Sequence, residues 1–126
     1  MQAPWPMIER VIIRALNDGL PSGRAGWNLP EAVEKEPGGF VRIARGPGSD
    51  DGTTDEPLID VEAFHPKREK AWELAEESRQ IMLALGATSA AGHLIDTSST
   101  ATSPNWVYYG PNVERYVASY RVGYRR

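Results

Sequence analysis

The sequence Leu58-Ile59-Asp60-Val61-Glu62-Ala63-Phe64 begins a segment in which the spacing of apolar residues changes from that of a strand to that of a helix. Apolar and acidic residues alternate within it, which is typical of a β-strand with one buried and one solvated face. Over residues 66–85 the apolar spacing becomes that of an amphipathic helix. The expected buried stripe of this helix is Ala71, Leu74, Ala75, Ser78, Ile81, Met82 and Leu85. A strand that leads directly into such a helix predicts a helix packed across a sheet.

The segments on either side of this unit supply further elements. They are predicted as a helix over 6–18, a weak strand over 24–29, a strand over 40–45, a flexible polar loop over 46–57, and strands over 93–102 and 113–124 joined by a turn at 103–105. The glycines and acidic residues of 46–57 cannot bury a core, so this loop is expected to be mobile.

The predicted fold class is α+β. Residues 1–126 are expected to form a single domain, with an antiparallel sheet of about four to five strands and two packed helices. In the last strand the even positions are expected to face the core, at Tyr116, Ala118, Tyr120, Val122 and Tyr124. With 126 residues, of which 40% are hydrophobic, the chain can bury one modest core.

The composition excludes several classes of protein. There is no cysteine, so disulfides and thiolate metal sites are excluded, and a reducing compartment is favoured. The apolar runs are too short to cross a bilayer, and the N-terminus lacks the features of a signal peptide, so a cytoplasmic product without membrane contact is expected. The pI of about 5.4 lies below that of a typical nucleic-acid-binding domain.

No catalytic or metal-binding pattern is present. The only histidines, His65 and His93, lack the spacing of zinc motifs and are interpreted as solvated residues. The serines and threonines of 97–103 form no nucleophile motif, and residues 46–48 lack the lysine of a phosphate-binding loop. The prediction is therefore no enzymatic activity, no cofactor and no metal.

Charge is distributed unevenly along the chain. Residues 31–62 hold nine acidic and three basic side chains, whereas 106–126 hold one acidic and four basic side chains. Opposite charges of this kind predict contact between copies of the chain, although scattered surface charge is a simpler interpretation. Trp5, Trp27, Trp72 and Trp106 are either core residues or interface anchors. The candidate interface residues are Asp50, Asp51, Asp55, Arg115, Arg121 and Trp106.

The order of these segments resembles the tail terminator proteins of siphophages, also called minor tail or tail completion proteins. The resemblance spans the whole chain, but it is a pattern and not a signature motif. It lies in Gly38-Gly39-Phe40-Val41-Arg42-Ile43, in 56–64 with the helix that follows, and in Ser103-Pro104-Asn105-Trp106 leading to 113–120.

The resemblance implies a structural virion protein that forms a ring, a hexamer in this family. The ring caps the tail tube and joins it to the head connector. The implied partners are other copies of the chain, the major tail tube protein and the head–tail connector protein. Viral DNA is expected to pass through the lumen without sequence-specific binding. The implied location is the head–tail junction of the virion, after assembly in the host cytoplasm.

Two alternatives remain open at this stage. The first is a head–tail connector or head completion protein, since these are also small ring formers. The second is a single-stranded nucleic-acid-binding module that uses the tyrosines and arginines near the C-terminus for stacking and phosphate contact. The even-numbered tyrosines are expected to face the core, which argues against this second alternative.

Overall fold

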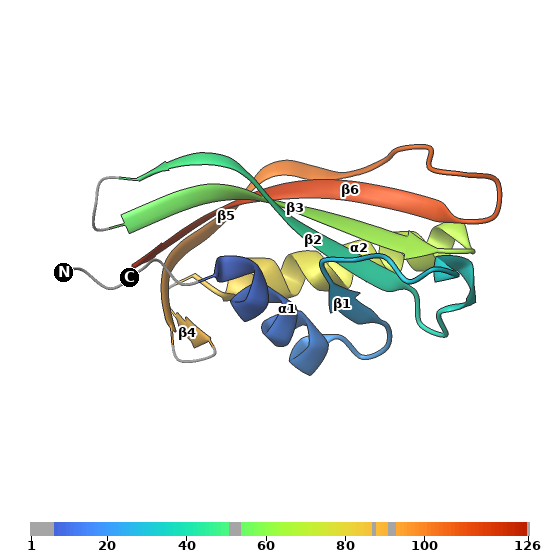
Figure 1. Ribbon diagram of the computed structural model, residues 1–126, viewed down its shortest axis with the longest axis horizontal. Helices are drawn as coiled ribbons and strands as arrows, with labels where there is room; N and C mark the ends of the chain where they lie inside the picture. The colour runs from blue at the N-terminus through green and yellow to red at the C-terminus, as the bar shows by residue number, and fades with distance from the viewer. Residues whose placement is uncertain (1–6, 51–53, 87, 91–92, 126) are drawn as a thin grey trace.

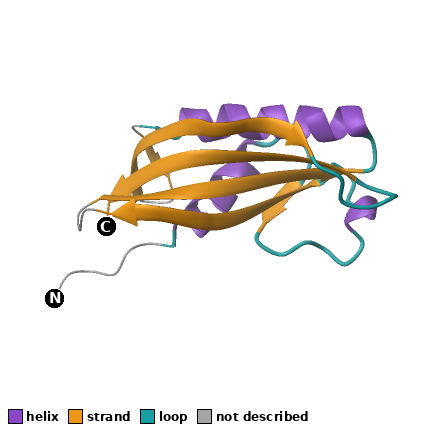
Figure 2. Ribbon diagram, turned by 90° about the horizontal axis from the view of Figure 1, so that it is seen from above, coloured by secondary structure: helices purple, strands orange, loops and turns teal. Residues whose placement is uncertain are grey.

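The computed structural model describes residues 7–50, 54–86, 88–90 and 93–125. In chain order the elements are α1 (Ile8–Gly19), β1 (Arg24–Gly26), the short 3₁₀ helix η1 (Val33–Lys35), β2 (Phe40–Asp50), β3 (Thr54–His65), α2 (Arg68–Ala84), β4 (Thr88–Ala90), β5 (His93–Trp106) and β6 (Glu114–Arg125). Both α-helices pack on the same face of one sheet (Figures 1 and 2). The predicted α+β class is confirmed.

The strand order within the described part of the sheet is β1-β2-β3-β6-β5-β4. The short β1 runs parallel to β2, and every other neighbouring pair is antiparallel. The sheet is therefore mixed, although its four long strands are antiparallel as expected. The last strand lies in the middle of the sheet, where it separates the two hairpins of the chain.

The core lies between the helices and the sheet. From α2 it receives the predicted stripe, with Ile81 only partly buried. Tyr120 and Tyr124 of β6 are 0% exposed, so the expectation that the even positions of this strand face the core is confirmed for both. The buried residues of α1 are Ile8, Val11, Ile12 and Leu16. No helix in the described part of the chain is long and apolar enough to cross a membrane.

A smaller cluster lies on the opposite face of the sheet. Phe40 and Phe64 pack there against Val33 of η1 and Val113, which precedes β6. The ring of Tyr109 meets Phe64 edge-on at 5.0 Å. This face is therefore covered at one end by the segment around η1 and by the connection between β5 and β6.

Two predicted connections are wrong. The loop over 46–57 is instead strand, because β2 continues to Asp50 and β3 begins at Thr54. The register shifts between Arg45 and Gly48 and then resumes, so a β-bulge absorbs Pro47, which has no N–H to donate. Of the predicted loop, residues 51–53 lie outside the described residues.

The turn over 103–105 is also wrong. β5 continues to Trp106, with register shifts around Thr102 that accommodate Pro104 in the strand. On the side away from β6 no described strand pairs with this part of β5, so a proline is tolerated there. The connection to β6 consists of residues 107–113.

Gly39, directly before β2, lies close to the backbone of β3. Its φ is +83°, and a Cβ built there would lie 2.5 Å from the carbonyl oxygen of Phe64. We expect Gly39→Ala to lower the free energy of unfolding by about 2 kcal/mol or more, measured by urea denaturation. Gly110→Ala is the matched control, since nothing lies within 4 Å of a Cβ there. Equal stability of the two variants would contradict this account.

Candidate functional site

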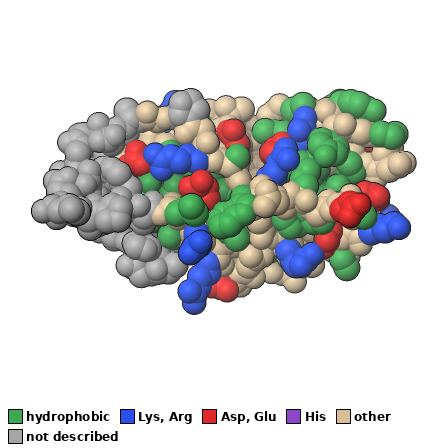
Figure 3. Space-filling model, in the orientation of Figure 1, with side chains coloured by type: hydrophobic (Ala, Val, Ile, Leu, Met, Phe, Trp, Pro, Cys, Tyr) green, Lys and Arg blue, Asp and Glu red, His purple; other side chains and the backbone are tan. Residues whose placement is uncertain are grey.

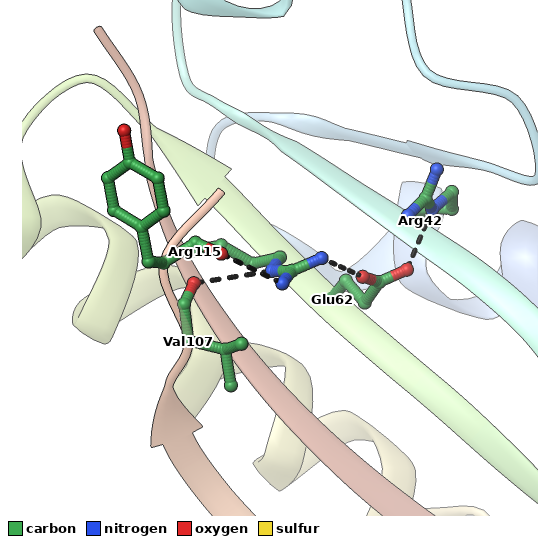
Figure 4. Close-up of polar contacts among 5 residues, drawn as sticks. Arg42, Glu62, Val107 and Arg115 are labelled. Atoms are coloured by element: carbon green, nitrogen blue, oxygen red, sulfur yellow. Dashed lines mark hydrogen bonds and ion pairs between the residues drawn. The ribbon is translucent and has the colours of Figure 1, made fainter. Parts of the chain in front are cut away.

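Glu62 links three strands on the face of the sheet that carries no α-helix (Figure 4). It accepts a hydrogen bond from Arg42 of β2 at 2.7 Å and one from Arg115 of β6 at 3.1 Å. Arg115 also donates to the carbonyl oxygens of Val107 and Tyr108, at 3.3 and 3.2 Å. One carboxylate thus joins β2, β3 and β6, and through Arg115 it also holds the connection between β5 and β6.

Aromatic rings cover the two arginines of this network. The guanidinium of Arg42 lies 5.6 Å from the ring centre of Phe64, and that of Arg115 lies 5.3 Å from the ring centre of Tyr109. The hydrogen bond to Glu62 raises the pKa of Arg42. The group is therefore a charged and well-packed junction, in which each side chain has partners within the chain.

A second network lies toward the other end of the strands. Asp55 is only 4% exposed and accepts hydrogen bonds from Arg45 and from the hydroxyl of Tyr124. Arg45 also donates to the Tyr124 oxygen at 2.7 Å. Burial raises the pKa of Tyr124 to about 12. The network explains why the sequence near Asp55 is strand and not loop, because a buried carboxylate requires fixed donors.

The candidate interface residues fall into different places. Asp55 and Arg115 already have partners within the chain, in these two networks. Arg121 is exposed on β6, and Trp106 is 38% exposed at the end of β5. Asp50 belongs to β2, and Asp51 lies outside the described residues. The acidic segment 31–62 and the basic segment 106–126 are predicted from the sequence to contact each other between copies. Within one chain they are already joined by the hydrogen bond from Arg115 to Glu62.

Exposed aromatic residues gather where β5 and β6 are connected and α2 begins, and Figure 3 shows hydrophobic side chains over this end of the molecule. Arg68 lies over Trp106 at 4.6 Å, and Trp72 packs edge-on against Tyr116 at 5.4 Å. Beside them is an open groove of about 580 Å³. We define the aromatic end as Arg68, Trp72, Trp106, Tyr108 and Tyr116. Sequence reasoning singled out Trp72 and Trp106, but it could not show that they lie together.

The tryptophans are not core residues in the described part of the chain. Trp27, Trp72 and Trp106 are 46%, 43% and 38% exposed, so the core interpretation is wrong for these three. Trp5 lies outside the described residues. Trp27 lies apart from the aromatic end, with Arg10 over its ring at 6.0 Å.

His65 has a local structural contact. Its Nδ1 accepts a hydrogen bond from the backbone N–H of Lys67 at 2.9 Å, at the junction of β3 and α2. Partial burial and then the charges of Lys67 and Lys70 lower its pKa. The side chain of His93 is outside the description. Among the described residues, no three histidine, aspartate or glutamate side chains come close enough to hold a metal ion.

The sequence of the chain is similar to that of a known protein family. The model described as phage tail termination protein matches residues 4–101, from before α1 into β5. The chain belongs to the phage tail termination protein family. A search of curated proteins gave no match.

Membership of this family makes the chain a structural component of the phage tail that interacts with other virion proteins. A structural role of this kind is consistent with the expected absence of catalysis. In this tail termination protein the matched region ends within β5, while β6, which completes the centre of the sheet, follows it. Tyr120 and Tyr124 are buried and cannot stack on bases, which argues against the nucleic-acid alternative, although Tyr108 and Tyr109 are exposed.

Two buried tyrosines on β6 provide a matched pair. Tyr124 is bonded to Arg45 and Asp55, whereas the hydroxyl of Tyr120 has no partner among the described residues. We expect Tyr124→Phe to destabilise the protein by about 1–3 kcal/mol, because Asp55 loses a donor. We expect Tyr120→Phe to be neutral or slightly stabilising. Urea denaturation at neutral pH distinguishes the two, and a larger loss at Tyr120 would contradict the assignment.

Alkaline pH should also lower stability through Tyr120. Burial raises its pKa from 10.0 to about 12, so the folded chain holds this proton where the unfolded chain has lost it. Stability is therefore fully present below about pH 10 and falls as the pH rises toward 12. We expect the wild type to lose on the order of 2–3 kcal/mol relative to Tyr120→Phe across this interval. Parallel stability profiles of the two proteins would refute the shift.

Proposed function

We propose that this tail termination protein assembles into a closed ring, a hexamer, that caps the finished tail tube and joins it to the head connector at the head–tail junction. Viral DNA would pass through the lumen without sequence-specific contacts. Family membership supports the termination role. The arrangement of the two outer strand edges supports the ring, and it is the observation that carries the proposal.

Each side of the sheet has a strand edge with incomplete pairing. On the side away from β6, β5 pairs with β4 only at His93–Ile95, and in the described structure no strand continues along residues 97–106. On the side away from β3, β2 pairs with β1 only at Phe40–Arg42. No described strand pairs with residues 43–46 on that side, before the bulge at Pro47. Such edges offer N–H and C=O groups to a further strand.

The stretches of β2 and β5 that lack a described partner strand lie at the same height along the strands, and the two strands have directions that allow antiparallel pairing. Arg45 of β2 is opposite Ile59, Ile59 is opposite Tyr120, and Tyr120 is opposite Thr100 of β5. The unpaired parts of β2 and β5 therefore lie in the same rows of the sheet. The three antiparallel pairings between them make β2 and β5 run in opposite directions.

These two properties are what a head-to-tail ring requires. In such a ring the β5 edge of one subunit faces the β2 edge of the next, and both subunits have the same orientation. The two edges would then pair as antiparallel strands. Because they lie at one level, neighbours need no shift along the axis, and the assembly closes instead of growing as a helix.

The candidate interface residues take two proposed roles in this ring. The proposed contacts with other subunits or ring partners are Arg121 and Trp106, which are exposed, Asp50 at the end of β2, and Asp51, which lies outside the described residues. Asp55 and Arg115 would act indirectly, because they hold the strands that carry the edges. The two ends of the long strands would then form the two faces of the ring, one toward the tail tube and one toward the connector.

Adjacent proline substitutions in β5 test the edge. Ser99 and Thr100 lie in a regular stretch opposite Arg121 and Tyr120, so their N–H groups point to opposite sides of the strand. Proline at one position removes a bond to β6 and destabilises the fold. At the other position we expect a folded subunit that forms no ring, because only the edge donor is lost.

The measurement is native mass spectrometry with electron microscopy, alongside thermal denaturation. The unchanged protein should give closed rings that bind purified tail tubes, whereas a connector protein would bind heads alone. If the folded proline variant closes rings as readily as the unchanged protein, the edge does not form the interface. A wild type that stays monomeric in the presence of tubes would refute the ring.

A further inference from the structure

We propose that the aromatic end is the docking site for a segment of another virion protein that carries one carboxylate beside an apolar side chain. The segment would place an apolar side chain against Trp72 and Tyr116 and a carboxylate against Arg68. This inference deepens the proposed function and rests on it in one respect, namely that a termination protein must bind a partner at one end of its strands.

The composition of the aromatic end is that of a binding surface. Trp72, Trp106 and Tyr108 are 43%, 38% and 64% exposed, although large aromatic side chains are usually buried. Trp, Tyr and Arg are the residue types that contribute most to the free energy of protein–protein binding. They come from three separate parts of the sequence and meet only in the folded chain, beside an open groove that Arg68, Glu69, Trp72, Glu73 and Tyr116 line.

The aromatic side chains are held in place before any partner binds. Trp72 packs edge-on against Tyr116, and Trp106 packs edge-on against Tyr108 at 6.4 Å. The indole Nε1–H of Trp106 donates to Glu114 at 2.7 Å. A surface that is already ordered loses less conformational entropy on binding. These contacts within the chain stabilise the side chains but leave much of their area exposed.

Charge indicates the chemistry of the partner. Arg68 lies over Trp106, and its Nε donates to the Tyr116 hydroxyl at 3.3 Å. No acidic side chain of the described residues lies within ion-pair distance of Arg68, whereas Lys70 beside it pairs with Glu73 at 3.2 Å. Glu114, which is bonded to Trp106, lies near Arg68 without forming an ion pair with it, so the stacked guanidinium can still bind a carboxylate from another molecule.

Two other occupants fit less well. Nucleic acid would bring a row of phosphates toward Glu69, Glu73 and Glu114, which lie in or beside the groove and repel a polyanion. A second ring docked through this same face would cover the surface on both rings, whereas docking through the other face would, if repeated, extend a stack of rings. Such growth is the opposite of termination. A single carboxylate beside an apolar side chain, on a different protein, brings only one negative charge toward these glutamates and does not extend a stack of rings.

The position of the surface allows docking together with ring closure. The aromatic end lies where α2 begins and β5 leads into β6, at the opposite end of the long strands from the end of β2 and the beginning of β3 (Figure 1). It belongs to the helix-bearing side and the end of the sheet, while the level shared by the two edges passes through Arg45 and Thr100. In the proposed ring the aromatic end would therefore be part of one axial face.

The test measures binding of the purified protein to tail tubes and to filled heads, both isolated from a phage mutant that lacks it. Trp72→Ala and Arg68→Glu should reduce binding to one of the two by roughly tenfold or more. Trp27→Ala and Arg14→Glu are the matched controls, since both residues are exposed elsewhere, and they should bind as the wild type does. Circular dichroism and native mass spectrometry verify folding and ring formation.

The outcomes separate the two proposals. Wild-type binding of tubes and heads by both aromatic-end variants would overturn the docking site and leave the ring intact. A selective loss of binding supports the docking site whether rings or single subunits are present, even if the ring proposal fails. Loss of binding to a DNA oligonucleotide, with tubes and heads still bound, would overturn the proposal in favour of nucleic acid. Stacked rings that disappear in Arg68→Glu would overturn it in favour of a second copy.

Discussion

The pairing of β6 between β3 and β5 is the constraint on which the rest of the structure depends. The two hairpins of the chain are joined in the sheet only through this strand, since β3 and β5 are each its neighbour and not each other's. Two of its inward residues, Tyr120 and Tyr124, are fully buried in the core between the sheet and the helices. A core built on the final strand forms only when distant segments meet, so secondary structure and core packing depend on each other.

The charged residues inside the sheet follow from the same constraint. Glu62 joins β2, β3 and β6, and Asp55 joins β2, β3 and β6 again nearer the other end of the strands. An acid next to the core is tolerated only with donors in fixed positions, and these donors come from strands that pairing has already aligned. The opposite charges of the acidic segment and the last strand therefore act first within the subunit, and stabilise the sheet.

The strand edges and exposed side chains that do not contribute to the core are consistent with a role in tail termination. In the described sheet the strand edges without a partner occupy one level on both sides, and the exposed aromatic residues other than Trp27 collect at one end. A subunit of this form presents different chemistry to its neighbours and to its axial partners. Such separation suits the proposed ring, in which subunits would pair with one another in one direction and bind a different molecule in another.

Local periodicity in the sequence was sufficient for both helices, for the alternating strand around Ile59 and for the inward tyrosines. These features depend on spacing within one element, which the order of residues records directly. The extension of β2 and β3 through the glycine-rich segment, the continuation of β5 past Pro104 and the joining of the aromatic end were decided only by the tertiary structure. Asp55 finds Tyr124 across 69 positions and Glu62 finds Arg115 across 53. A partner at such a distance leaves no periodic signal, because it is chosen by strand order and register, and not by neighbouring residues.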